Sequence, residues 1–183
     1  METASNPLTI VTDIRTLTET AKEVNAECIA IVDNTFVTPL LVKPLSLGVD
    51  IVLHSMTKYI NGHGDVIAGV LVSNRPEIMQ IASQTVIDFG SCLSPFDSYL
   101  ALRGLRTLAC RMECLSKNAL LVAKFLSTHP CVACIRYPGL PSHPQHHTVL
   151  KMLVNPPVDT ESAEGFPFSG MISINIKTPD ETY

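Results

Sequence analysis

Three short runs rich in apolar residues, each followed by polar side chains, constrain the fold of this chain most strongly. They are Cys28–Val32, Asp50–His54 and Val66–Val72. Cys28–Val32 is continuous, too short for a helix, and typical of a parallel-sheet strand that is buried on both faces. Apolar residues recur at helical spacing over 13–27 and 76–87. This order of elements predicts an α/β domain with a largely parallel sheet.

The pattern changes after Pro95. Residues 96–127 form a long apolar-periodic stretch that predicts one helix, or two helices with a break near Gly104. Further along we expect a strand, a loop, a stretch rich in proline and acidic residues, and a final strand, over residues 131–137, 141–147, 155–167 and 170–176. We place a domain boundary near residue 100, which divides the chain into residues 1–100 and 101–183.

Composition excludes several classes of protein. The chain has 183 residues with 13 Lys plus Arg and 17 Asp plus Glu, a net charge of −4, which argues against nucleic-acid binding. No apolar run reaches the roughly 18 residues that suggest a membrane span. The first residues carry no basic region before an apolar stretch, so no secretory signal is expected. Six cysteines without such a signal predict reduced thiols in a cytoplasmic protein.

Polar side chains follow the first two predicted strands. Asp33 ends one strand, and Ser55, Thr57 and Lys58 begin the loop after the next. Because adjacent parallel strands lie about 4.8 Å apart, these side chains could share one pocket. A lysine beside two hydroxyls and opposite a carboxylate suits pyridoxal 5′-phosphate (PLP). The spacing alone also fits a surface lysine and an aspartate that caps a turn.

Longer motifs add a resemblance to a known family. They include the segments Val32–Pro39, Pro44–Asp50, His54–Val66, Leu93–Asp97, Arg103–Leu108 and Tyr137–His146. Together they resemble the Cys/Met-metabolism PLP-dependent enzymes, which include cystathionine γ-lyase, cystathionine γ-synthase, cystathionine β-lyase and methionine γ-lyase. The segment Glu2–Pro7 is similar to a motif of the same family, with Ala4 where that motif has proline. The motifs follow in the family's order over nearly the whole chain.

The resemblance implies roles for six residues. Lys58 would be the Schiff-base lysine and proton shuttle, and Asp33 would pair with the pyridine nitrogen. Ser55 and Thr57 would hold the phosphate. Asn6 would lie near the phenolic oxygen of the cofactor and the substrate carboxylate, and Thr35 would line the pocket behind the ring. The resemblance implies no metal.

The same resemblance implies a fold and an assembly. The fold would be the aspartate-aminotransferase-like, fold type I architecture. Residues 1–100 would be the C-terminal part of the large PLP-binding domain, and residues 101–183 the long helix and beginning of a small α+β domain. Family members are about twice as long, so both domains are expected to be incomplete. A homotetramer is implied, with no nucleic-acid or membrane partner.

The implied activity is that of a carbon–sulfur lyase of trans-sulfuration, of the cystathionine γ-lyase or methionine γ-lyase type. Its substrate would be a sulfur amino acid such as cystathionine, methionine or homocysteine. One alternative is the cystathionine γ-synthase or β-lyase member of the family. A second is an inactive truncated relative, since the abrupt end after Pro179 suggests a cut through a fold. A third is a small zinc protein that uses Cys131 and Cys134 of a C-x-x-C motif.

Overall fold

The computed structural model describes residues 1–157 and 165–177. The helices are α1 (Ile14–Val24), α2 (Thr38–Leu41), α3 (Pro76–Phe89), α4 (Pro95–Leu105), α5 (Leu108–Ser127) and α6 (His146–Met152). Two short helical turns are η1 (Pro44–Leu47), which is 3₁₀, and η2 (Met56–Ile60), which is π-helical. The strands are β1 (Ile31–Asp33), β2 (Ile51–Ser55), β3 (Gly69–Val72), β4 (Val132–Arg136) and β5 (Ser173–Ile176).

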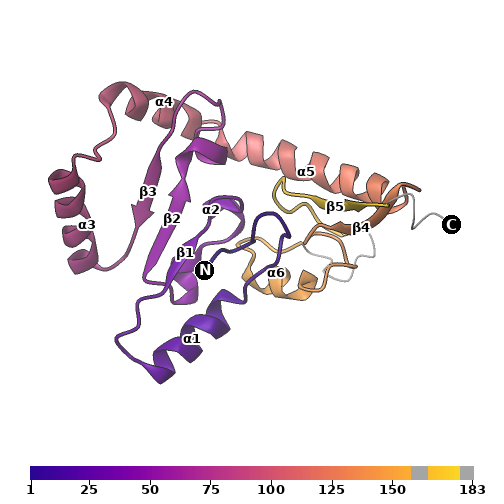
Figure 1. Cartoon of the computed structure of the whole chain (residues 1–183), viewed down its shortest axis with the longest axis horizontal. Coiled ribbons are helices and arrows are strands. Elements are labelled where there is room, and N and C mark those ends of the chain that lie inside the picture. Colours follow the sequence, from indigo (N-terminus) through magenta and orange to yellow (C-terminus); the bar gives the residue numbers. More distant parts are fainter. Residues whose placement is uncertain (158–164, 178–183) are drawn as a thin grey trace.

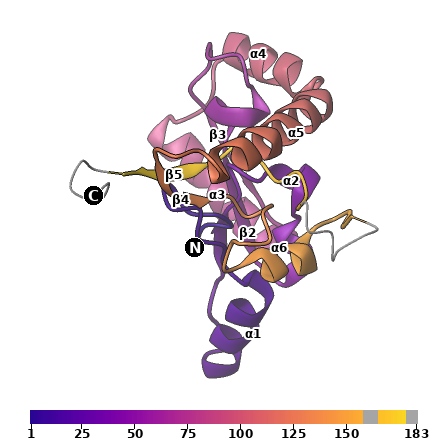
Figure 2. The same ribbon diagram turned by 90° about the vertical axis from the view of Figure 1, so that its right-hand side faces the viewer.

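The strands form two separate sheets (Figure 1). One has the order β1-β2-β3, with α1 and α3 at its sides, and the other is an antiparallel pair of β4 and β5 that lies along α5. The turned view places α1 and α4 at opposite ends of the molecule (Figure 2). The mixed architecture fits the α/β prediction, and the boundary near residue 100 stays a prediction.

The three-stranded sheet is mixed. β1 and β2 are parallel, with Val32 opposite Val52. The connection through α2 and η1 carries the chain back to the end of the sheet at which β1 begins, so β2 runs in the same direction. β2 and β3 are antiparallel, with His54 opposite Val70. The segment 56–68 folds back beside β2 and contains no crossover helix, so β3 departs from the parallel order.

The N-terminal residues extend the sheet beyond β1. The amide of Asp33 donates to the carbonyl of Met1 over 2.9 Å, and the amide of Thr3 donates to the carbonyl of Asp33 over 3.0 Å. Thr3 Oγ1 then donates to Oδ1 of buried Asn34 over 2.8 Å. The segment that begins the chain is thereby fixed beside the carboxyl end of β1.

The first apolar run is buried on one face only, so the prediction of burial on both faces is wrong. Ala30 and Val32 belong to the buried residues, whereas Ile29 and Ile31 remain 49% and 47% exposed. Val32 joins a core that spans both sheets and includes Ile14, Val37, Val42, Val52, Ala123, Tyr137, Val149 and Phe168. The strand thus has the alternation of a half-buried sheet.

Several local predictions are confirmed. Asp13 caps α1 by accepting a hydrogen bond from the Thr16 amide over 3.1 Å. The helix predicted over 76–87 is α3, and the long stretch after Pro95 forms two helices, of which α4 ends at Leu105. The predicted loop over 55–65 instead contains η2.

The second half also departs from prediction at one helix. Residues 146–152 form α6 where a loop was predicted through His147, because His146 and Val149 are buried and direct one face of that segment into the core. Of the segments predicted at 155–167 and after Pro179, residues 158–164 and 178–183 lie outside the described residues. Within the described ranges, no helix is long and apolar enough to cross a membrane.

Candidate active site

A small polar cavity of about 200 Å³ lies where β1 and β2 end. Its lining comes from the N-terminal segment, the residues after β1, and the junction of β2 with η2. The residues are Glu2, Ala4, Asp33, Thr35, Phe36, Val37, Ser55 and Lys58. The structure therefore brings together four of the six predicted site residues, at the edge of the sheet where α/β folds bind ligands.

Thr35 connects the two strands that carry this cavity. Its amide donates to Asp33 Oδ1 over 2.9 Å, and its Oγ1 accepts from the Ser55 amide over 2.7 Å. Thr35 itself is buried. One threonine thus holds the carboxylate after β1 and the backbone at the end of β2 in a fixed relation.

Lys58 lies in the π-helical turn η2 and is exposed at the cavity. Its backbone is non-helical, with φ −88° and ψ −121°, inside an otherwise helical turn. The Gly62 amide donates to the Lys58 carbonyl over 2.8 Å, which closes the turn. Lys58 also lines a wider hollow of about 790 Å³ that runs towards α5.

The two remaining predicted residues are not among the cavity's lining residues. Thr57 Oγ1 accepts from the Ala68 amide over 3.0 Å, so its hydroxyl ties η2 to the segment before β3. Asn6 is exposed, and its amide donates to Glu2 Oε2 over 3.4 Å. Sequence reasoning missed Glu2 and Phe36 as lining residues, although both lie inside segments that carry the family resemblance.

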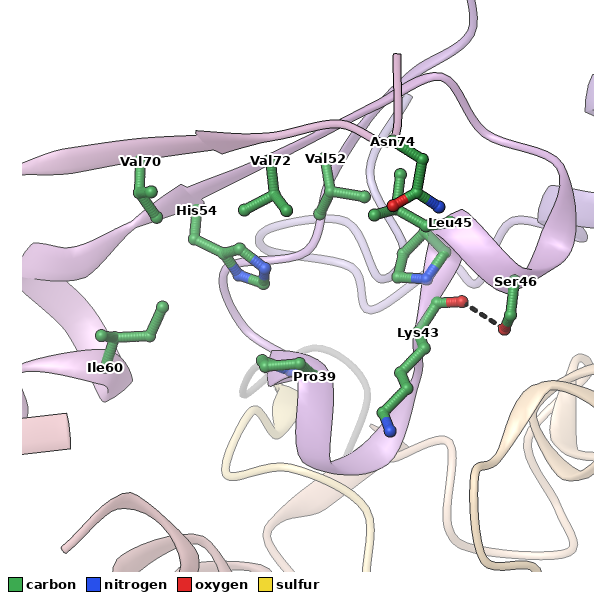
Figure 3. Close-up of a pocket in the computed structure, with 11 residues that line it drawn as sticks. Pro39, Lys43, Leu45, Ser46, Val52, His54, Ile60, Val70, Val72 and Asn74 are labelled. Carbon is green, nitrogen blue, oxygen red and sulfur yellow. Dashed lines mark hydrogen bonds between the residues drawn. The ribbon is translucent and has the colours of Figure 1, made fainter. Parts of the chain in front are cut away.

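A second, apolar cavity of about 490 Å³ lies on the other side of β2 (Figure 3). Val52 and His54 reach it from β2, and Val70 and Val72 reach it from β3. His54 projects into this cavity with 5% of its surface exposed. Within the described part of the chain its Nδ1 has no hydrogen-bond partner.

Burial sets the protonation of His54. Loss of hydration lowers its pKa, although the charge of Asp33 and the backbone of Asn34 act in the opposite direction. The lowered pKa favours the neutral form of the ring. Burial and the lowered pKa place His54 among the core side chains.

The C-x-x-C motif gives the zinc interpretation no support. Cys131 and Cys134 are both exposed, and β4 has a register irregularity between Val132 and Cys134. His146, which is nearby in sequence, is buried and its Nδ1 lies 3.1 Å from the Pro138 carbonyl. Over residues 1–157 and 165–177, no group of three or more His, Cys, Asp or Glu side chains could hold a metal ion.

Comparison with known proteins now decides the family. The sequence profile of the family described as "Cys/Met metabolism PLP-dependent enzyme" matches residues 1–178. The chain belongs to this family. It is 42% identical to a cystathionine γ-synthase of Mycobacterium leprae over 97% of the chain, and 49% identical to a cystathionine γ-lyase of Dictyostelium discoideum over 80% of the chain.

Solved structures of the family share the fold. The cystathionine γ-synthase of Xanthomonas oryzae, solved in complex with aminoacrylate and cysteine, superposes with a TM-score of 0.87 at 40% identity over 97% of the chain. The chain covers 42% of that protein and of the M. leprae relative, and 37% of the D. discoideum one. The fold type I prediction is confirmed, and the chain spans less than half the length of these relatives.

The donors at the polar cavity fit the family's cofactor. An amine from Lys58, a carboxylate from Asp33 and a hydroxyl from Ser55 line one space. These groups match an aldehyde, a protonated pyridine nitrogen and a phosphate respectively. The opposite cavity around His54 offers mainly apolar surface and does not match those three groups.

Proposed function

We propose that this chain supplies the lysine side of the active site of a PLP-dependent carbon–sulfur lyase that acts on sulfur amino acids. The observation that carries the proposal is the joint placement of Asp33, Ser55 and Lys58 around one cavity. Family membership supports the cofactor. The relatives include a cystathionine γ-lyase and an L-methionine γ-lyase, which support the lyase type and a substrate such as cystathionine, methionine or homocysteine.

Three residues would hold the cofactor. Lys58 Nζ would attach covalently to its aldehyde carbon, Asp33 would accept a hydrogen bond from its pyridine nitrogen, and Ser55 Oγ would donate to its phosphate. When bound, PLP supplies an electron sink for the electron pair left at the substrate Cα. Thr35 would line the pocket behind the ring, and its hydrogen bonds hold Asp33 and the backbone of Ser55 near each other.

Lys58 would also move protons. Its Nζ, when not bonded to the cofactor, would take a proton from the substrate Cα. After releasing that proton, the same Nζ would take one from Cβ and donate it to the sulfur that leaves from Cγ, so that the leaving group departs as a thiol. Placement at a turn, exposed to the cavity, lets the long side chain reach successive carbons from one backbone position.

The positions of Thr57 and Asn6 in the structure change the roles that we propose for them. The Thr57 hydroxyl accepts a hydrogen bond from the Ala68 amide over 3.0 Å and donates to the Ala68 carbonyl over 3.4 Å, so we propose that it serves the phosphate by turning its hydrogen away from this longer contact. Asn6 would contribute near the substrate carboxylate after a shift of the 5–9 segment, because its side chain is exposed and outside the cavity lining. The homotetramer implied by the resemblance is likewise a proposal, and sedimentation of the chain with PLP measures it.

A second candidate function is a non-catalytic relative that binds the cofactor weakly or not at all. The observation that favours it is coverage, since the chain spans 42% of the length of the cystathionine γ-synthases it matches. The hollow of about 790 Å³ beside Lys58 is also widely open to solvent.

One experiment separates the two candidates. The chain is incubated with PLP, reduced with borohydride, and digested for mass spectrometry. The proposed function predicts a phosphopyridoxyl group on Lys58 and release of a keto acid from cystathionine or methionine. An adduct on Lys58 without keto-acid release supports the non-catalytic relative. Absence of any adduct on Lys58 overturns cofactor binding by this chain.

A further inference from the structure

Arg111 reaches from α5 to the turn that carries Lys58. Its Nη1 donates to the Tyr59 carbonyl over 2.6 Å, and its Nη2 donates to the Ile60 carbonyl over 3.1 Å. These two acceptors follow Lys58 directly in the chain. The guanidinium thus engages the backbone of η2 and not its side chains.

The other side of the same guanidinium is held at the α4–α5 junction. Nη2 donates to the Gly104 carbonyl over 2.8 Å, and Nε donates to Thr107 Oγ1 over 3.0 Å. Arg111 is partly buried, and desolvation lowers its pKa. A planar fork with donors fixed in direction can join two backbone segments in this way, whereas a lysine ammonium cannot reproduce the geometry.

Two glycines allow this close approach. A Cβ on Gly62 would overlap the guanidinium of Arg111, and a Cβ on Gly104 would overlap the carbonyl oxygen of Asn61. Gly62 also has φ +70°, which glycine adopts without strain. The turn after Lys58 is therefore packed against the α4–α5 junction with no room for a side chain at either contact.

The turn needs outside support. Lys58 itself has non-helical backbone angles inside η2, so the hydrogen bonds of a regular helix do not fix its direction. The internal bonds run from the Asn61 amide to the carbonyls of Met56 and Lys58, and from the Gly62 amide to the carbonyl of Lys58. Arg111 supplies contacts on the Tyr59 and Ile60 carbonyls, which accept none of these bonds.

We propose that Arg111 is a positioning residue for Lys58, because its guanidinium clamps the carbonyls of Tyr59 and Ile60 to the α4–α5 junction and so aims the lysine into the cavity. This inference rests on the proposed function in assigning the chemistry of Lys58. The clamp itself is a property of the chain without cofactor. It makes the reactivity of Lys58 depend on a helix that lies outside the three-stranded sheet.

The test compares four variants with the unaltered chain. R111K keeps the charge and loses the fork, and R111M removes both. G104A keeps Arg111 but forces Asn61 away from α4. R106M is the matched control, because it removes an exposed arginine from the same junction. Two measurements are made on each chain: hydrogen–deuterium exchange of residues 56–62 without cofactor, and the yield of borohydride-trapped phosphopyridoxyl-Lys58.

The expected result is local. Exchange of the Asn61 and Gly62 amides rises about 10-fold or more in R111K, R111M and G104A, as for loss of bonds from a charged donor. Amides within α1 and within β2 keep their protection. The adduct yield at Lys58 falls in R111K, R111M and G104A, and it falls most in the variant whose exchange rises most. R106M matches the unaltered chain in both measurements. A purely structural role would raise exchange throughout the molecule and would not single out this turn.

The outcomes distinguish two failures. Unchanged exchange and unchanged adduct yield in R111K and G104A overturn the clamp, whatever R111M does. If R111M does not fold, R111K and G104A decide the question. If the unaltered chain forms no adduct at Lys58, the proposed function fails, while faster exchange in R111K still supports the clamp. If the adduct forms equally in all four variants and in the unaltered chain, the positioning role of Arg111 is overturned and the cofactor proposal stands.

Discussion

The two cavities on either side of β2 differ sharply, although successive residues of one strand line them. Val52 and His54 point to the larger cavity, which is mainly apolar, while Ser55 follows at the smaller one beside Asp33 and Lys58. Side chains alternate between faces along a strand. Two faces of one strand therefore serve opposite purposes, one as a packing surface and one as a chemical site.

This difference shows which positions of a strand place a polar side chain where it can face a ligand. Ser55 and Asp33 both stand at strand ends, where the backbone leaves the sheet and side chains are free to face a ligand. His54 stands one residue earlier, inside the strand, and its polar ring is directed among valines. A shift of a single residue exchanges a reactive position for a buried one.

The largest expected effect breaks the polar cavity. K58R keeps a positive charge, but its guanidinium cannot form the covalent bond with the cofactor aldehyde, so borohydride trapping at residue 58 should disappear completely. Mass spectrometry after reduction measures this. Lys43, at the rim of the apolar cavity, provides the control, because K43R should leave the adduct at full yield. In K58R, an adduct on another lysine would show that Lys58 is not the residue that binds the cofactor.

The next effect weakens the polar cavity without removing its lysine. D33N keeps the shape of the side chain and an oxygen for the Thr35 amide, but removes the charge that would pair with the pyridine nitrogen. We expect PLP affinity to fall about 10- to 100-fold, the size of a lost charged hydrogen bond. Absorbance titration with PLP measures it. Equal affinity in D33N and the unaltered chain would place the pyridine nitrogen elsewhere.

A smaller effect tests the link between the strands. T35V removes the acceptor of the Ser55 amide and should lower the free energy of unfolding by about 1–3 kcal/mol. Urea denaturation followed by circular dichroism measures this. T18V is the matched control, because Thr18 is buried in α1 and its Oγ1 has no hydrogen-bond partner among the residues described. A loss in T18V as large as that in T35V would contradict the bridging role.

The smallest effect concerns the apolar cavity and pH. The folded-state pKa of His54 lies below its unfolded value, so its contribution to stability is fully present above about pH 6.5 and is lost as pH falls towards the folded pKa. H54L should flatten this part of the stability curve, measured by urea denaturation between pH 7.5 and pH 5. His143 and His146 also have lowered pKa values and stay in both chains, so the difference between curves isolates His54. Parallel curves would show that unfolding does not change the pKa of His54.

Much of the site could be predicted because it is local. Asp33 and Ser55 each follow an apolar run, and Lys58 follows Ser55 within one turn, so short-range patterns together with the family motifs indicate all three. The occupied hydroxyl of Thr57 could not be predicted, because it depends on how residue 68 folds back. The exposure of Ile31 depends on which face of the sheet receives a covering layer, and an apolar run does not carry that information.

Longer-range features were beyond the sequence. α6 was missed because Pro144 and Gln145 directly before it and the two histidines at its start resemble a loop, and burial of His146, Val149 and Met152 gives it a core face. Contacts of Arg111 with Tyr59 join positions 52 residues apart. No periodicity or motif spacing relates such positions, and the arginines nearby in sequence suggested only helix-surface contacts.

That separation along the chain also orders events in time. A ribosome delivers Tyr59 52 residues before Arg111, which at about 5–20 residues per second is an interval of roughly 3 to 10 s. During it the turn around Lys58 is already synthesised, and β1 and β2 can pair, but the residue that braces the turn does not yet exist. The nascent chain can therefore form its sheet before Arg111 is available to hold the turn that carries Lys58. Under the proposed clamp, a translation product that ends before Arg111 would carry Lys58 without that contact.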